Sequence, residues 1–156
     1  MADSPVFSHR AVRAGFAAGG SAFLAVVGYL LWNVGQVGLR GTPLAFLAVL
    51  VTPVITLSVA TLVWRVGMPD EPTPVYGAIA GAATAAVSIS LFRAFIGVLA
   101  SITDGSASTL AGSVSEAISF AGSFAVYGGL FTLPVVVPLG ALLGYGYEWY
   151  VARTQP

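Results

Sequence analysis

The sequence predicts an all-α, polytopic integral membrane protein with four transmembrane helices. Hydrophobic residues make up 57% of the 156 residues and charged residues only 8%, and the mean hydropathy is +0.91. An average soluble domain is about 25% charged. Four long apolar stretches each reach the roughly 20 residues that a helix needs to cross the hydrocarbon core. They cover residues 14–37, 44–64, 76–100 and 118–147, and the little chain left over indicates a single transmembrane domain spanning 1–156.

The first two predicted spans are expected to form a hairpin. Arg10 and Arg13 precede the first span, whose apolar run is too long for the core of a signal peptide, so we expect it to stay uncleaved. The connection at 39–43 is a tight turn in which Thr42 can cap and Pro43 can begin the next helix. A turn this short places spans 1 and 2 side by side and antiparallel.

Proline positions predict bends in the second and fourth spans. Pro53 lies inside span 2, and Pro134 and Pro138 lie inside span 4. Each proline removes a backbone donor and crowds the carbonyl group four residues earlier, which kinks a helix. We therefore expect spans 2 and 4 to be kinked.

The two remaining connections differ in character. Segment 66–74 holds three prolines and two acidic residues, so we expect a short extended linker. Segment 101–117 is rich in Ser, Thr and Gly, and Leu110, Val114 and Ile118 follow one another at four-residue spacing. This spacing indicates a short helix on the outer surface before the fourth span.

The arginines predict the orientation of the chain. Cytoplasmic segments of membrane proteins carry an excess of Arg and Lys. Only Arg40 lies in a connection on the side opposite the termini, whereas four arginines fall on the side of the termini, namely Arg10, Arg13, Arg65 and Arg153. We therefore expect a multi-pass protein of a prokaryotic cytoplasmic membrane with both termini inside the cell.

Composition excludes several classes of function. The chain has no cysteine, so it offers no disulfide, no thiolate nucleophile and no cysteine-ligated metal. Its formal net charge is zero, which gives no electrostatic footprint for nucleic acid. His9 is the one histidine and has no second ligand at suitable spacing, and no serine or threonine has a base in reach. We expect no metal, no cofactor and no enzymatic activity.

Arg93 is the candidate site residue within the spans. One interpretation is a site for an anion, a lipid phosphate or a substrate carboxylate. The other is that its side chain reaches the outer headgroups or pairs with Asp104 or Glu116 in the outer connection. We favour the second, because the outer interface is only about one side-chain length away. Glu148 ends span 4 and is too shallow for a proton-coupling carboxylate, so we expect an interfacial anchor there.

Small residues at four-residue spacing mark candidate helix-packing positions. Such residues allow the backbones of two membrane helices to approach closely. The positions either pack within the chain or meet a second subunit, and the sequence leaves both interpretations open. They are Gly15, Gly19, Gly77, Gly81, Ala85, Ser88, Gly140 and Gly144.

Two hypotheses about function follow from these features. The leading one is a non-catalytic membrane subunit or scaffold that acts by helix packing with itself or with a partner membrane protein. The alternative is a small transporter or channel with a path lined by span 4 and Arg93. The spans offer few polar residues for such a path beyond Asn33, Gln36, Arg93 and hydroxyl groups, so we favour the scaffold.

Overall fold

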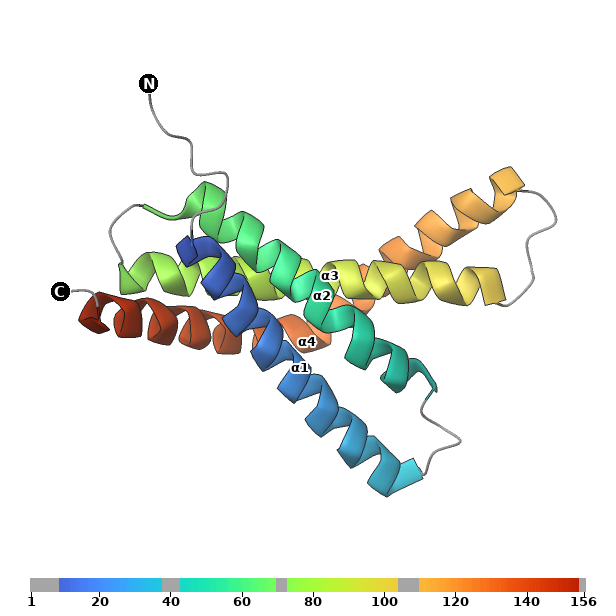
Figure 1. The fold of residues 1–156 in the computed structure, drawn as a ribbon. Helices are drawn as coiled ribbons and strands as arrows, with labels where there is room; N and C mark the ends of the chain where they lie inside the picture. The colour runs from blue at the N-terminus through green and yellow to red at the C-terminus, as the bar shows by residue number, and fades with distance from the viewer. Residues whose placement is uncertain (1–8, 38–42, 70–72, 104–109, 155–156) are drawn as a thin grey trace.

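The computed structural model describes residues 9–37, 43–69, 73–103 and 110–154. These residues form four α-helices and no strand, so the all-α part of the prediction is confirmed for them (Figure 1). The helices are α1 (His9–Val37), α2 (Pro43–Gly67), α3 (Pro74–Thr103) and α4 (Leu110–Thr154).

Three of the four helices are long and apolar enough to cross a membrane. The segments that meet both criteria are Arg10–Gln36 in α1, Phe46–Gly67 in α2 and Pro74–Leu99 in α3. Helix α4 is the longest, with 45 residues. Its first turns occupy 110–118, where a separate surface helix was expected. No proline interrupts the chain between Leu110 and Ile118, so nothing ends the helix there and it continues into the apolar stretch.

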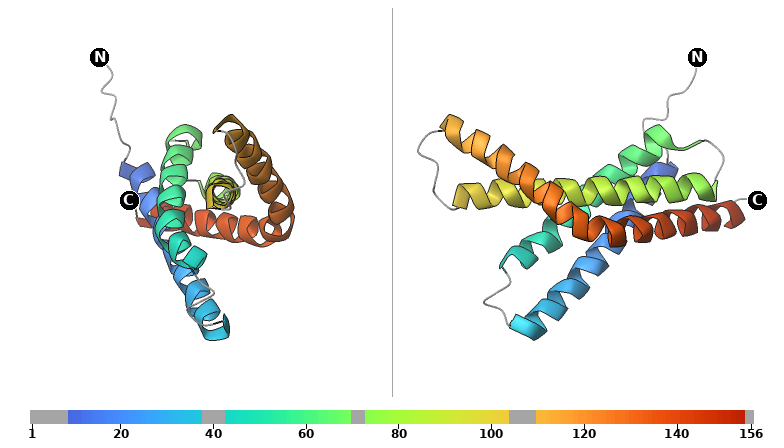
Figure 2. Two further views of the ribbon diagram at one scale, coloured as in Figure 1. Left: turned by 90° about the vertical axis from the view of Figure 1, so that its right-hand side faces the viewer. Right: turned by 180° about the vertical axis from the view of Figure 1, so that it is seen from behind.

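The helices are arranged as two hairpins. Most contacts between elements lie within the pair α1–α2 and within the pair α3–α4, and the two pairs meet mainly through α2 and α3. The hairpins lie close together where α1 and α3 begin and α2 and α4 end, which we call the proximal end. They diverge toward the opposite, distal end (Figures 1 and 2).

Helix α4 bends along its length. Its first part and its last part run in clearly different directions (Figure 2), and Pro134 and Pro138 both lie inside the helix. Pro53 lies inside α2, which continues as a helix on both sides of it.

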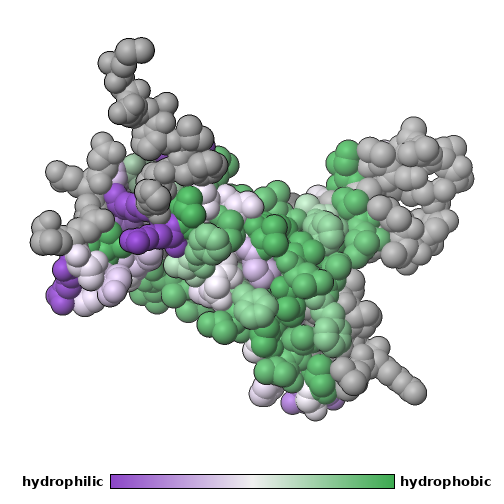
Figure 3. Space-filling view, in the orientation of Figure 1, coloured by the Kyte–Doolittle hydropathy of each residue, from purple (hydrophilic) through white to green (hydrophobic). Residues whose placement is uncertain are grey.

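Small side chains form the core, and most large apolar side chains face outward. The buried cluster near the proximal end consists of Ala11, Ala14, Ala60, Trp64 and Ala80. In contrast, Leu24, Leu50 and Leu142 are each about 70% exposed, and apolar residues cover most of the middle of the molecule (Figure 3). This is the reverse of a protein folded around a large apolar core in water.

Candidate functional site

Glycines on α3 and α4 bring these two helices into close contact. Gly77 and Gly81 on α3 lie against Gly144 and Gly140 on α4. A Cβ atom added at Gly140 would lie 2.5 Å from the Cβ of Ala85 and 2.6 Å from the carbonyl oxygen of Gly81. A contact of that length is too short for any residue larger than glycine without movement of the backbone. These predicted packing positions therefore lie inside the α3–α4 hairpin.

Gly15 and Gly19 have the same role in the first hairpin. A Cβ atom at Gly19 would lie 3.1 Å from the Cβ of Leu57 and 3.2 Å from the carbonyl oxygen of Pro53, and Gly15 faces Leu57 and Thr61. In each hairpin, the second helix therefore packs closely against two glycines near the start of the first helix. The structure places the second helix, rather than another subunit, against both glycine pairs.

Glu148 lies in a cluster of polar and aromatic side chains at the proximal end. Its side chain is fully buried, with 0% of the residue exposed. Arg10 donates from Nη2 to Oε2, in an ion pair, and from Nε to Oε1 at 3.3 Å. Trp64 donates from Nε1 to Oε1 at 2.9 Å. A Cβ at Gly77 would clash with the Glu148 side chain, so the glycine makes room for it. All four helices thus contribute to its surroundings.

Tyr147 and the segment after α2 complete this group. The Arg10 guanidinium also donates from Nη1 to the carbonyl oxygen of Pro69 at 2.9 Å, and the Tyr147 hydroxyl donates to the carbonyl oxygen of Arg10 at 3.4 Å. The rings of Trp64 and Tyr147 meet edge to face, with centroids 6.2 Å apart. We call Arg10, Trp64, Tyr147 and Glu148 the proximal cluster.

The sequence did not predict the proximal cluster. Glu148 was expected to be an interfacial anchor, but it is an internal partner of Arg10. The signal that was available is topological: the start of the first helix and the end of the fourth lie at the same end of a four-helix chain, and they carry opposite charges. The sequence did not indicate whether the Arg10 and Glu148 side chains point toward each other.

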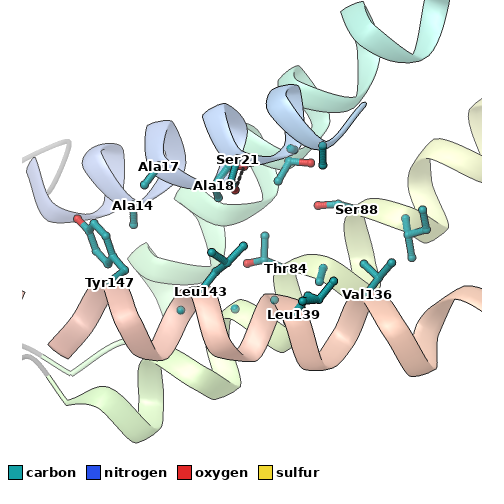
Figure 4. Close-up of a pocket in the computed structure, with 18 of the residues that line it drawn as sticks. Ala14, Ala17, Ala18, Ser21, Thr84, Ser88, Val136, Leu139, Leu143 and Tyr147 are labelled. Carbon is teal, nitrogen blue, oxygen red and sulfur yellow. Dashed lines mark hydrogen bonds between the residues drawn. The ribbon is translucent and has the colours of Figure 1, made fainter. Parts of the chain in front are cut away.

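A cleft of about 340 Å³ lies between the two hairpins and is partly open. Ala14, Trp64 and Tyr147 line it near the proximal end, and it reaches Val26 on α1 and Val136 on α4 (Figure 4). Alanine, valine, leucine and glycine make up most of its wall, and none of the described residues that line it is acidic or basic. The cleft is therefore apolar and uncharged.

Three hydroxyl groups in the wall of the cleft have no partner among the described residues. They are those of Thr52 on α2 and of Thr84 and Ser88 on α3. Thr84 is 4% exposed and Ser88 is 5% exposed, and both side chains point into the space between the hairpins (Figure 4). A buried hydroxyl without a hydrogen bond costs about 1–3 kcal/mol. Ser88, which was predicted to be a packing residue, thus lines the cleft.

Arg93 belongs neither to the proximal cluster nor to the wall of the cleft. Its Nη2 donates to Oγ1 of Thr132 on α4 at 2.7 Å, whereas its Nη1 is buried without a partner among the described residues. The expected path along span 4 and Arg93 therefore does not coincide with the cleft, because Arg93 does not line it. Asp104 and the side chain of Glu116 lie outside the described residues, and pairing of Arg93 with either one stays a prediction.

Metal-binding geometry is not found in the part of the chain that the structure describes, where no three His, Cys, Asp or Glu residues come together. Comparisons with protein family models, with curated proteins and with solved structures gave no match for the chain.

Proposed function

We propose that all four helices cross the cytoplasmic membrane of a prokaryote, with both termini in the cytoplasm. Three helices meet the length and composition of a span, and α4 contains the fourth apolar stretch of the sequence, at 118–147. The proximal end carries Arg10, Arg65 and Arg153, which supports its assignment to the cytoplasmic side. The exposed leucines and valines of the middle then contact lipid.

We further propose that the protein is a small membrane carrier that holds a ligand between its two hairpins. The observation that carries this proposal is the uncharged cleft between the hairpins, which are tied together at the proximal end and diverge at the distal end. The scaffold hypothesis depended on small-residue positions for which the sequence left open whether they pack within the chain or meet a second subunit. Gly81 and Gly140 contact each other inside the chain, which favours the carrier.

The proximal cluster acts as the closed end of this carrier. Arg10 and Trp64 belong to the first hairpin and Glu148 to the second, so their hydrogen bonds join the two hairpins directly. Many transporters work by rocking one helical repeat against another around a fixed site. Loss of the contacts to Glu148 would release one hairpin from the other at the cytoplasmic end.

Distances between spin labels on the two hairpins test this proposal without a known ligand. The chain has no cysteine, so labels attach only at introduced sites. Leu31→Cys with Val98→Cys reports on the distal end, and Phe16→Cys with Ile79→Cys reports on the proximal end, all four positions being exposed. In lipid nanodiscs we expect Glu148→Gln to lengthen and broaden the proximal distance and to shorten the distal one.

Arg153→Gln is the matched control, because Arg153 lies over the ring of Trp149 at 3.8 Å on α4 and does not join the hairpins. It should leave both distance distributions unchanged. If Glu148→Gln also leaves both distributions narrow and unchanged, the hairpins form one rigid body and the carrier is refuted.

A scaffold remains the second candidate because of one feature of α1. Gly28 and Gly35 lie seven residues apart on one face of the helix, and a Cβ at either would meet nothing within 4 Å. Another helix can approach this face closely. Gly28→Leu would then shift the native assembly to smaller species, whereas Gly146→Leu, at another open glycine, would not.

A further inference from the structure

We propose that the cleft binds one neutral, lipid-soluble molecule with an apolar body and a hydroxyl or carbonyl oxygen. This inference rests on the proposed function in that it concerns the same cleft, but it requires binding only and no movement of the hairpins. It assigns the chemistry of the ligand from the side chains that the ligand would meet.

The residues that line the cleft indicate that most of the ligand is apolar and that it is small. Alanines of α1 and the side chains of Val136, Leu139 and Leu143 on α4 belong to its apolar surface, and they offer only van der Waals contact. At about 340 Å³, the volume lies at the lower end of the range of about 300–1,000 Å³ that is usual for ligand pockets. The occupant is therefore a small apolar molecule or one segment of a longer chain.

The hydroxyl groups without a partner indicate that the ligand carries an oxygen atom that can form hydrogen bonds. Serine and threonine in helices commonly bond to the carbonyl group three or four residues earlier. Ser21 and Ser58 do so, and Ser90 on α3 donates to the carbonyl oxygen of Ala86 at 2.8 Å. Thr84 and Ser88 lie on the same helix as Ser90 and make no such bond. Their hydroxyls, and that of Thr52 across the cleft, are left to bond with an oxygen of an occupant.

The uncharged lining of the cleft indicates a neutral ligand. Within the part of the chain that the structure describes, no acidic or basic residue lines the cleft. The Arg10–Glu148 ion pair does not line it, and Trp64 and Tyr147 stand at the cleft's proximal end beside that pair. An ion inside this cleft would lose its hydration without gaining a counter-charge, which is strongly unfavourable. Ions and charged metabolites are thereby excluded as occupants.

Trp64 provides a built-in reporter for this ligand. It lines the cleft and is only 6% exposed, whereas Trp32 is 68% and Trp149 is 44% exposed. With Trp32→Phe and Trp149→Phe, Trp64 is the only tryptophan in the chain. A bromine atom quenches tryptophan fluorescence at close range, so a brominated probe bound in the cleft will quench Trp64.

Three probes of equal chain length separate the chemical classes. They are 12-bromododecan-1-ol, 1-bromododecane and 12-bromododecanoate, added to the single-tryptophan protein in nanodiscs. We expect half-maximal quenching by the alcohol at about tenfold lower concentration than by the hydrocarbon, because the alcohol adds hydrogen bonds to the hydroxyls of the cleft. The carboxylate should quench least. Equal quenching by the alcohol and the hydrocarbon would mean that an ordinary lipid chain fills the cleft, and it would overturn the inference.

Substitutions that each remove one hydroxyl group locate the polar contact. Thr84→Val and Ser88→Ala should each raise the concentration of the alcohol needed for half-maximal quenching by about fivefold and leave quenching by the hydrocarbon unchanged. Ser90→Ala is the matched control on the same helix, because the Ser90 hydroxyl is already bonded to Ala86, and it should change neither. If Thr84→Val and Ser88→Ala both behave like Ser90→Ala, the hydroxyls do not contact the ligand and the inference is wrong.

The outcomes for the ligand and for the carrier can be told apart. A preference for the alcohol that depends on Thr84 and Ser88, together with label distances that do not respond to Glu148→Gln, supports the ligand class and refutes the carrier. Hairpins that move without any saturable quenching of Trp64 refute the ligand class alone, and water is then the partner of the hydroxyls.

Discussion

Arg10 on α1 and Glu148 on α4 are 138 residues apart in the chain, and their side chains form an ion pair inside the bundle. The carboxylate has no exposed surface, and both of its oxygens accept hydrogen bonds from Arg10, with Trp64 as a further donor to one of them. A buried charge is tolerated only when its hydrogen bonds are made in full. The contact therefore determines how the first and last helices lie against each other.

Removal of either charge should destabilise the protein, but not to the same extent. Arg10→Met leaves the fully buried Glu148 carboxylate uncompensated, with an expected cost of about 3–5 kcal/mol in the free energy of unfolding. Glu148→Met leaves Arg10 without its counter-charge, and it should cost less because the Arg10 side chain is 17% exposed to solvent. The double variant leaves no charge and should be more stable than either single variant. Denaturant unfolding in detergent micelles, followed by circular dichroism, measures all three values. Single-variant costs that simply add in the double variant would show that the two side chains do not act as a pair.

The glycines of α4 should differ sharply in their tolerance of alanine. A Cβ at Gly144 would meet the backbone of Gly77 and lie 3.0 Å from the Cα of Gly81, whereas a Cβ at Gly146 would meet nothing within 4 Å. We expect Gly144→Ala to lower the free energy of unfolding by about 1–3 kcal/mol through overpacking. Gly146→Ala should raise it by up to about 1 kcal/mol, because alanine favours a helix. Equal effects at the two positions would contradict the close packing of α3 on α4.

Thr132 should contribute to stability through Arg93. Thr132→Val keeps the shape of the side chain but removes the acceptor that lies 2.7 Å from the Arg93 Nη2 atom. A hydrogen bond to a charged group contributes about 1.5–3 kcal/mol, and we expect a loss within that range. Ser123→Ala is the control on the same helix, because that exposed hydroxyl donates to the carbonyl oxygen of Ser119, one turn earlier on α4. The two variants should differ in melting temperature, and identical values would exclude a role for Thr132.

Both termini should lie in the cytoplasm. Single cysteines at Ser4, Ser108 and Thr154 report the position of the N-terminal segment, the connection between α3 and α4, and the end of α4, since the chain has no other cysteine. Only Ser108→Cys should react with a membrane-impermeant thiol reagent in intact cells, because the excess of arginine places the termini inside. Labelling at position 4 or 154 in intact cells would reverse the orientation.

Sequence patterns predicted the helices well because the length and apolarity of a stretch are properties of the chain alone. The stretches 14–37, 44–64 and 76–100 each lie within a helix, although the helices extend further at one or both ends. The helix-packing role of Gly81 and Gly140 followed from their size. Which chain they pack against was left open by the sequence, because small residues suit both cases.

The candidate site was largely missed because it depends on how the helices are rotated and crossed. Ser88 was assigned to packing from its spacing, but it faces the cleft, and Thr84, one turn earlier, was not singled out. Residues of all four helices form the cleft, and no local sequence pattern shows which residues of different helices come together. Glu148 was judged by its depth along one helix, whereas its burial comes from side chains of α1 and α2.

The pairing of the first helix with the last has a consequence for biogenesis. A ribosome delivers the chain from its N-terminus, so Arg10 leaves the ribosome long before its carboxylate partner has been synthesised. The glycine contacts of α1 with α2 form early and need nothing from the second half of the chain. Closure of the proximal end therefore comes last, and a chain that stops before Glu148 leaves Arg10 without its ion-pair partner.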